Sequence, residues 1–271
     1  MQGKIDFTAV VQLARKAGDA IMDIYNRDFS IGIKADDSPL TEADLAAHNC
    51  IINGLNKITP ELPQLSEESA NIPWPTRQHW NNYWLIDPLD GTKEFIKRNG
   101  EFTVNIALIS NSQPIWGVVY APAKDLLYYG GPAQGNSVKT ANSLTTNIHT
   151  KSAPSTTESW KIVGSKSHQS DAFAALVKRF SKPDIVNLGS SLKICMVAEG
   201  SADLYPRLGL TSEWDTAAAH AVLQGAGGEI YNAETLLPLQ YNLKESLLNP
   251  FFHAIGETKS FSEFSKQYLQ H

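Results

Sequence analysis

Apolar side chains follow a helical spacing through the N-terminal part of the chain. Over about residues 6–26 they recur every three or four positions, at Phe7, Val10, Val11, Ala14, Ala17, Ile21 and Ile24. This spacing predicts a long amphipathic helix. After the polar residues 34–39, a second helix is expected from Thr41, whose hydroxyl can cap its first turn. The apolar stripe of this second helix runs through Leu45, Ile51, Leu55 and Ile58.

Beyond Pro60 the pattern changes to short apolar runs, which are typical of strands. Strands are predicted at residues 83–86, 102–109, 115–120 and 126–129, with the last two as hairpin partners. Residues 130–158, rich in Gly, Ser, Thr and Asn, predict a further hairpin and then the loosest part of the chain.

The second half alternates between the two kinds of element. Strands are predicted at residues 161–163, 185–188, 202–205 and 229–231, and helices at 171–180, 192–199 and 215–224. Such alternation indicates an α/β layer architecture. We therefore expect an α+β subdomain over residues 1–155 and an α/β subdomain over residues 156–271.

Composition and charge exclude several classes of protein. The chain has 271 residues, enough for one or two domains, and 23 basic against 28 acidic residues give a net charge of −5. This balance argues against a protein that wraps duplex nucleic acid, although a local basic cluster can still bind a small anion. Cys50 and Cys195 fit neither a disulfide framework nor a zinc site. Because no signal peptide or membrane span is predicted, a cytoplasmic location is expected.

The segment with the most candidate functional residues is Trp84-Leu85-Ile86-Asp87-Pro88-Leu89-Asp90-Gly91-Thr92. We expect the strand to stop at Asp87, because Pro88 follows it, and the chain to turn at Gly91 into a helix. Asp87 and Asp90 could then converge beside helix-start N–H groups, where hard oxygen ligands and an anion suit Mg²⁺. A turn in which both aspartates merely cap the backbone explains the spacing equally well.

Three further acids have ordinary structural explanations when each is taken alone. Glu67 and Glu68 follow a short apolar strand, where a solvated loop would suffice. Asp215 stands at a predicted helix start, where it could be a cap, and Asp44 could serve as first-turn charge.

In this order along the chain, however, these segments resemble the lithium-sensitive, magnesium-dependent phosphatase superfamily that contains inositol monophosphatases. The similarity is closer still to the bacterial 3′(2′),5′-bisphosphate nucleotidases of the CysQ type. It extends over residues 38–250, and residues 87–95 (DPLDGTKEF) and 214–218 (WDTAA) are highly specific. Inositol phosphatases typically have Thr-Asn-Phe where this chain has Lys93-Glu94-Phe95.

The resemblance implies a layered αβαβα sandwich and a set of site residues. The groups implied to hold Mg²⁺ are the carboxylates of Glu67, Asp87, Asp90 and Asp215 and the carbonyl of Leu89. The groups implied to bind the scissile phosphate include the turn Asp90-Gly91-Thr92. Asp44 and Thr92 are implied to orient and deprotonate the attacking water, and Glu67 is implied to be a further catalytic residue. Four carboxylates and two Mg²⁺ ions would cancel in charge, and direct attack by a metal-activated water, without a phosphoenzyme, is favoured.

Further positions match those that face the nucleoside and its second phosphate: His168, Ser190, Lys193 and Arg207. The choice of Ser190 over Ser191 stays open. The implied activity is Mg²⁺-dependent hydrolysis of the 3′-phosphate of adenosine 3′,5′-bisphosphate to AMP, which clears a by-product of sulfate assimilation. Action on 3′-phosphoadenylyl sulfate and a peripheral association with the cytoplasmic face of the inner membrane also remain open.

Two alternatives are weighed against this activity. An inositol monophosphatase or sugar bisphosphatase would share the metal core, but Lys93-Glu94 and the pair Lys193 and Arg207 argue against it. A nucleotide sensor without turnover is disfavoured by the intact pair Asp44 and Thr92.

Overall fold

The computed structural model describes residues 5–33, 39–155, 157–165, 171–256 and 261–269. Its helices are α1 (Phe7–Tyr25), α2 (Glu42–Ile58), α3 (Trp74–Arg77), α4 (Thr92–Ile96), α5 (Asp171–Val177), α6 (Leu192–Ala198), α7 (Trp214–Gly225) and α8 (Phe261–Phe264). Short single turns are η1 (Glu67–Ser69), η2 (Pro122–Lys124) and η4 (Ser265–Leu269).

A seven-stranded sheet has the order β3-β4-β5-β6-β7-β8-β9, and only its first pair is parallel. Its strands are β3 (Gln64–Ser66), β4 (Asn82–Asp90), β5 (Thr103–Ser110), β6 (Gln113–Ala121), β7 (Leu126–Gly131), β8 (Asn136–Ala141) and β9 (Leu144–Ile148). A separate antiparallel pair consists of β1 (Ile31–Ile33) and β2 (Pro39–Thr41).

A five-stranded mixed sheet has the order β11-β10-β12-β14-β13. Its strands are β10 (Trp160–Ser165), β11 (Pro183–Leu188), β12 (Leu204–Arg207), β13 (Glu229–Asn232) and β14 (Phe252–Ile255). β10 runs parallel to β11 and β12, whereas β14 runs antiparallel to β12 and β13.

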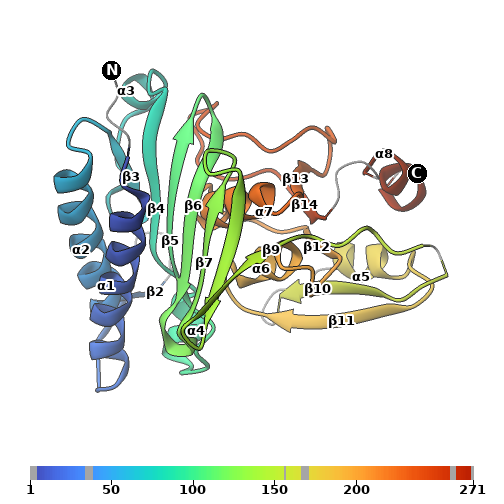
Figure 1. Cartoon of the computed structure of the whole chain (residues 1–271), viewed down its shortest axis with the longest axis horizontal. Coiled ribbons are helices and arrows are strands. Elements are labelled where there is room, and N and C mark those ends of the chain that lie inside the picture. The colour runs from blue at the N-terminus through green and yellow to red at the C-terminus, as the bar shows by residue number, and fades with distance from the viewer. Residues whose placement is uncertain (1–4, 34–38, 156, 166–170, 257–260, 270–271) are drawn as a thin grey trace.

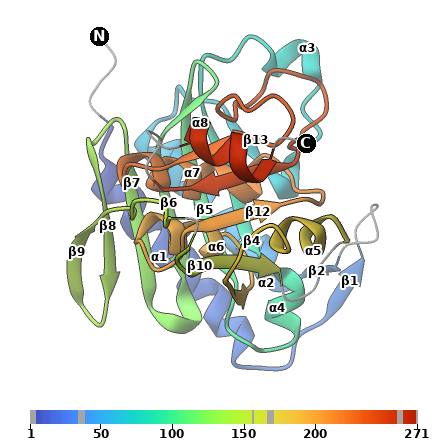
Figure 2. The ribbon, with the colours of Figure 1, turned by 90° about the vertical axis from the view of Figure 1, so that its right-hand side faces the viewer.

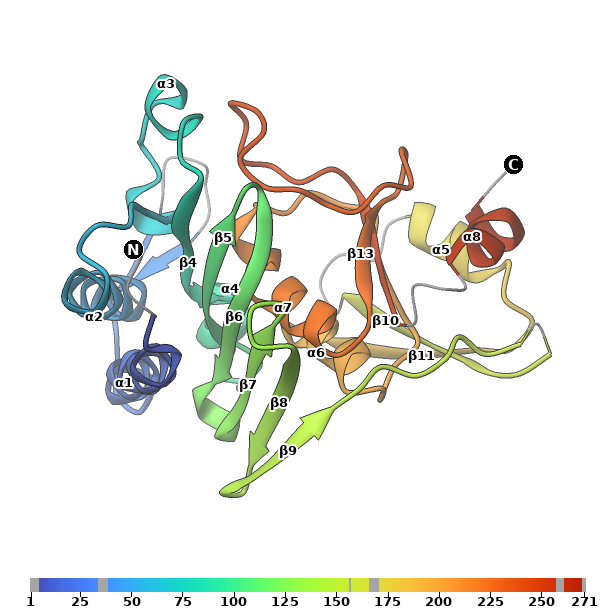
Figure 3. The same cartoon turned by 45° about the horizontal axis from the view of Figure 1, so that its top comes forward.

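Helices and sheets alternate in layers, which confirms the αβαβα architecture. The pair α1 and α2 covers one face of the seven-stranded sheet (Figure 1). Helices α6 and α7 lie between the two sheets, as Figure 3 shows, and their side chains share one buried cluster with both sheets. Helices α5 and α8 cover the outer face of the five-stranded sheet (Figure 2).

The two N-terminal helices form where the periodicity predicts them. In α1 the buried face includes Val10, Ala14, Ala17, Ile21 and Ile24. Thr41 caps α2 as expected, with its Oγ1 accepting a hydrogen bond from the Ala43 N–H (3.2 Å). The prediction for Leu45 is wrong, because this side chain is 45% exposed. The buried face of α2 runs through Ala43, Ala47, Ile51 and Leu55, and a residue two positions after Ala43 points away from it.

Helix α7 packs closely on the seven-stranded sheet. A Cβ atom added to Gly117 in β6 would lie 2.3 Å from the Ala218 carbonyl oxygen, so only glycine allows this approach. Helix α7 thereby brings Asp215 to the end of β4. The subdomain boundary near residue 155 stays a prediction. Within the described ranges, none of the helices is long and apolar enough to cross a membrane.

Candidate active site

The carboxyl end of β4 carries the first two predicted aspartates. The expectation that the strand stops at Asp87 is wrong, because β4 continues to Asp90. Asp87 lies opposite Asn105 in β5 and Asp90 lies opposite Thr103, so β4 holds one extra residue between them. Such a bulge tolerates Pro88, which has no N–H to donate to a neighbouring strand.

This bulge also fixes the buried side chain of Asp87. Its Oδ1 accepts a hydrogen bond from the Leu89 N–H (3.0 Å), and the residue is only 1% exposed. Gly91 follows with φ of 94°, a left-handed conformation that favours glycine, and α4 begins at Thr92. The predicted strand, turn and helix are therefore present, with the strand longer than expected.

Asp44 and Thr92 meet as the resemblance implies. The Thr92 hydroxyl donates a hydrogen bond to Asp44 Oδ1 (3.2 Å). Asp44 Oδ2 accepts two hydrogen bonds, from the Thr41 N–H (2.7 Å) and the Thr41 hydroxyl (2.6 Å), in the capping box of α2. Asp44 is thus both a helix-capping acid and a partner of Thr92.

Four carboxylates interact electrostatically at this place. Burial raises the pKa of Asp87 well above its usual value, and the charges of Glu67, Asp90 and Asp215 raise it further. Burial likewise raises the pKa of Asp215 to about 8, with the charge of Asp90 as the next cause. The pKa of Asp90 rises to about 6 through burial, against the opposing effects of Lys193 and the Ser191 N–H.

The predicted metal ligands do not form a closed cage. In the part of the chain that the structure describes, no three acidic, histidine or cysteine side chains converge on one point that could hold a metal ion. Asp90 Oδ2 instead accepts a hydrogen bond from the Ser191 N–H (2.5 Å), and Asp215 Oδ2 accepts one from the Ser212 N–H (2.9 Å). Asp87 and Glu67 are hydrogen-bonded to each other.

The donor set nevertheless fits Mg²⁺. All of the donors are hard oxygens, and the mutual repulsion of the buried carboxylates is what a cation relieves. Mg²⁺ is usually held by one or two carboxylates, with water and substrate phosphate completing its shell, so a cage of three side chains is not required.

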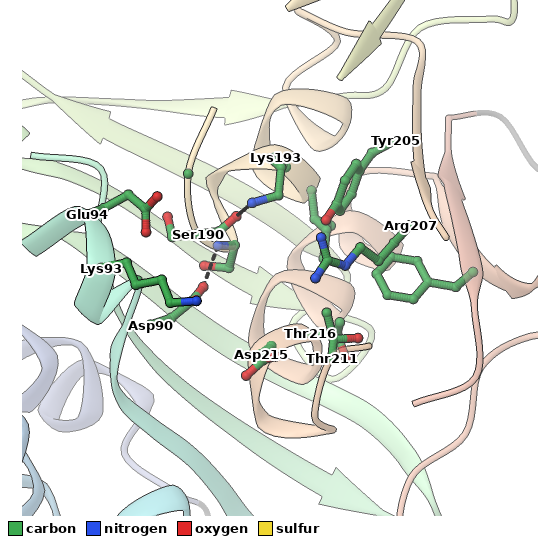
Figure 4. A pocket seen from close by; sticks show the side chains of 15 residues that line it. Asp90, Lys93, Glu94, Ser190, Lys193, Tyr205, Arg207, Thr211, Asp215 and Thr216 are labelled. Atoms are coloured by element: carbon green, nitrogen blue, oxygen red, sulfur yellow. Dashed lines mark hydrogen bonds between the residues drawn. The ribbon is translucent and has the colours of Figure 1, made fainter. Parts of the chain in front are cut away.

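A cavity opens beside these carboxylates, and its lining includes Asp90, Asp215 and the three cations Lys93, Lys193 and Arg207. In Figure 4 the ammonium of Lys93 lies on the Asp90 side and the guanidinium of Arg207 lies on the Tyr205 side. Lys193 is only 8% exposed, and its Nζ donates a hydrogen bond to the Ser190 carbonyl (2.6 Å). Burial lowers the pKa of Lys193 to about 8, while the charge of Asp90 opposes this shift.

The two serines at the start of α6 are used differently. The Ser191 hydroxyl lies within 2.9 Å of Thr103 Oγ1 and donates to Asn105 Oδ1 (2.8 Å), so its hydrogen-bonding capacity is used inside the protein. Both serines line the cavity. Ser190 has a left-handed φ of 51°, and within the described residues its hydroxyl oxygen accepts only a long hydrogen bond, from the Leu192 N–H (3.5 Å). This difference favours Ser190 for substrate contact. His168 lies outside the described residues.

Several cavity residues escaped the sequence analysis. Tyr205 and Phe252 line the same cavity, and their rings meet edge to face at 5.7 Å. Tyr205 was noted only as a strand end, and Phe252 lies in β14, which was not predicted at all. Thr211 also lines the cavity, from a loop without a motif.

Comparison with known proteins supports the family that the sequence resembles. Residues 5–250 match the model of the inositol monophosphatase family. The chain belongs to this family, which consists of metal-dependent phosphatases. It is 48% identical over 245 residues to the 3′(2′),5′-bisphosphate nucleotidase CysQ of Salmonella typhimurium, covering 90% of this chain and 96% of the relative. CysQ of Escherichia coli K12 shows the same identity and coverage.

Solved structures of members of this family resemble the chain in fold. The crystal structure of CysQ from Bacteroides thetaiotaomicron superposes with a TM-score of 0.81 at 41% identity, over 92% of this chain and 96% of that one. An inositol monophosphatase from Anabaena superposes with a TM-score of 0.72 at 22% identity, over 96% and 93% of the two chains. The second likeness shows the fold alone. The resemblance stated from the sequence is confirmed.

Proposed function

We propose that this chain hydrolyses the 3′-phosphate of adenosine 3′,5′-bisphosphate to yield AMP and phosphate. The observation that carries the proposal is the mixed lining of one cavity. It contains the buried carboxylates of Asp90 and Asp215 together with the cations Lys193 and Arg207. A substrate with two phosphates could use both groups at once, one phosphate at the carboxylates through bound metal and the other at the cations, and the 48% identical relatives are bisphosphate nucleotidases.

The reacting water would be prepared by Thr92 and Asp44. Because Thr92 donates its proton to Asp44 Oδ1, its own oxygen is free to accept a proton from a water in the cavity. As that water attacks phosphorus, a proton passes from water to Thr92 and from Thr92 to Asp44. The bond to the ribose 3′-oxygen breaks in line with the attack, and this oxygen takes up a proton from solvent.

The groups that would hold Mg²⁺ are Glu67, Asp87, Asp90, Asp215 and the carbonyl of Leu89. When bound, the ions supply positive charge that stabilises the attacking and leaving oxygens. The scissile phosphate would lie over the turn Asp90-Gly91-Thr92, within reach of the Thr92 hydroxyl.

The second phosphate would meet Lys193 and Arg207. Arg207 donates through one terminal nitrogen to the Leu210 carbonyl (2.8 Å) and is also hydrogen-bonded to Tyr205, whereas its buried Nε has no hydrogen-bond partner among the described residues. A guanidinium with unused buried donors is suited to a phosphate oxygen. Ser190 would add its hydroxyl from the start of α6.

Substrate choice tests this assignment most directly. Arg207→Ala and Lys193→Ala should each lower kcat/KM for adenosine 3′,5′-bisphosphate about ten- to a hundredfold, because a charge-assisted hydrogen bond is lost. Both variants should lose far less on adenosine 3′-monophosphate, which keeps the scissile phosphate and lacks the second one. Lys16→Ala on the exposed side of α1 is the matched control and should leave both rates unchanged.

Two results would contradict the proposal. Equal losses on both substrates would mean that the two cations serve the scissile phosphate or the fold. Faster release of phosphate by the wild type from inositol 1-phosphate than from the bisphosphate would favour an inositol monophosphatase.

Removal of divalent cations by a chelator should abolish phosphate release from every substrate. A cytoplasmic location, action on 3′-phosphoadenylyl sulfate and a role in sulfate assimilation extend the proposal.

A further inference from the structure

Asp90 is held by a residue from the other half of the chain. Asp90 ends β4, whereas Ser191 lies 101 positions later and immediately precedes α6. The Ser191 N–H donates to Asp90 Oδ2 at 2.5 Å. The same segment is also bound two residues earlier, where the Gly189 N–H donates to Glu101 Oε2 (2.9 Å). A Cβ atom at Gly189 would lie 2.8 Å from the Glu101 carbonyl oxygen, so this segment sits tightly on the residues before β5.

A buried relay of hydrogen bonds supports the same contact. Thr103 Oγ1 and Ser191 Oγ are 2.9 Å apart, and Ser191 Oγ donates to Asn105 Oδ1 (2.8 Å). Because Ser191 has a single hydroxyl proton, this arrangement requires Thr103 to donate to Ser191. The Asn105 amide nitrogen then points to Asp90 Oδ2 (3.5 Å). The side chains of Thr103, Asn105 and Ser191 are at most 3% exposed.

The hydrogen bonds of this relay reach one carboxylate oxygen of Asp90, Oδ2, and not the other. In the described ranges both donors to Asp90, the Ser191 N–H and the Asn105 amide, end on Oδ2, and the Thr103 hydroxyl, whose proton goes to Ser191, also lies nearer this oxygen (3.5 Å). Oδ1 is therefore left for a ligand. A carboxylate that ligates a metal is commonly oriented by hydrogen bonds in this way, and loss of such a partner typically costs 10–100-fold in metal affinity.

We propose that Ser191 is a positioning residue that orients Asp90 for its metal. Its hydroxyl, held between Thr103 and Asn105, sets the direction of the Asn105 amide and the place of its own N–H, and both donors fix Asp90 Oδ2. The contact also ties metal binding in the first half of the chain to the seating of α6, which carries Lys193. This inference rests on the proposed role of Asp90 as a metal ligand.

The test compares metal binding with substrate binding. Mn²⁺ is titrated into the metal-free full-length protein, without substrate, and its dissociation constant is measured by electron paramagnetic resonance. Ser191→Ala should weaken Mn²⁺ binding about tenfold or more. At saturating Mg²⁺, its KM for adenosine 3′,5′-bisphosphate should stay close to that of the wild type. Ser190→Ala, the matched neighbour, should raise this KM and leave the Mn²⁺ dissociation constant unchanged.

A second pair of variants guards against misfolding of the first. Thr103→Val has nearly the shape of threonine but cannot donate to Ser191, so it should weaken Mn²⁺ binding in the same direction. Thr103→Ser keeps the hydroxyl and should restore most of the affinity. Thermal melting of each metal-free variant separates lost fold from lost affinity.

Two failures are distinguishable. If the wild type hydrolyses the bisphosphate and binds Mn²⁺ while Ser191→Ala and Thr103→Val bind Mn²⁺ equally well, the positioning role is overturned and the proposed function stands. If the wild type does not hydrolyse the bisphosphate but Ser191→Ala still weakens Mn²⁺ binding, the proposed substrate is wrong and the positioning role of Ser191 stands.

Discussion

At the scale of single residues, Asp44 shows how one carboxylate can serve the fold and the proposed chemistry together. Its Oδ2 closes the capping box of α2, and its Oδ1 accepts a hydrogen bond from the Thr92 hydroxyl. The residue that caps the start of the helix is therefore also the proposed proton acceptor. Because the cap holds the carboxylate still, Thr92 meets a fixed acceptor.

A double-mutant experiment tests whether this pair acts as a unit. Thr92→Val and Asp44→Asn should each lower kcat strongly, and the double variant should be hardly worse than the poorer single variant. Thr41→Val weakens the cap without removing the Thr92 contact. Its melting temperature therefore measures how much the cap of α2 contributes to the stability of the fold. Fully additive losses in kcat would show that Asp44 is only a capping acid and that water is activated elsewhere.

Asp90 carries the sharpest prediction for a single side chain. Asp90→Asn keeps the shape and removes the charge, so phosphate release should fall by several orders of magnitude. Because the folded-state pKa of Asp90 is raised from 3.8 to about 6, Asp90 is ionised above pH 6 at a cost in stability of the metal-free fold. The metal-free variant should therefore melt at a higher temperature than the metal-free wild type at pH 8. Near-native turnover at ordinary Mg²⁺ would contradict the role of Asp90.

At the scale of elements, the close approach of β6 and α7 decides where Asp215 lies. Gly117 faces the backbone of Ala218, with no room for a Cβ atom. The helix that packs here begins at Trp214 and carries Asp215 in its first turn. A substitution that moves α7 away from β6 should therefore also displace Asp215 from the site.

Gly117→Ala tests this contact. Overpacking against backbone should destabilise the fold by about 1–3 kcal/mol or more, measured by denaturant unfolding. Gly32→Ala is the control, since among the described residues a Cβ atom there would meet only the Leu40 carbonyl oxygen, at 3.6 Å, an ordinary contact. Equal stability of the Gly117→Ala variant and the wild type would show that α7 can withdraw from the sheet without cost.

At the scale of the whole molecule, the second sheet buries a titratable group. His253 lies in β14 between β12 and β13 and is 2% exposed. Its Nδ1 has no hydrogen-bond partner within the described residues. Burial lowers the pKa of His253 from 6.5 to about 4. The unfolded chain therefore binds a proton at this residue between those two pH values, and the folded chain does not.

The sign of the pH effect follows. The stability that neutral His253 contributes is fully present above pH 6.5 and is lost as the pH falls toward 4, by about 3 kcal/mol. His253→Phe removes this titration with a ring of similar shape. Denaturant unfolding at several pH values should show a steeper fall between pH 6.5 and 4 for the wild type than for the variant. Parallel curves would mean that His253 is protonated without cost.

Much of the molecule could be predicted locally. The two N-terminal helices and the Thr41 cap follow from spacing and capping residues, which act within a few positions along the chain. The carboxylates also lie in short segments whose order along the chain indicates the family. These features need only neighbouring residues, so the sequence by itself determines them.

Tertiary structure decided the rest. Strand β4 continues past Pro88 because β5 accommodates a bulge, which no local rule shows. Strand β14 has only four residues and is defined by its two neighbours. The contacts of Thr92 with Asp44 and of Ser191 with Asp90 join positions 48 and 101 residues apart. Which serine keeps its hydroxyl available to the cavity and which uses it inside the protein depends on such long-range contacts, because only the packed sheets and helices bring the partners within hydrogen-bonding distance.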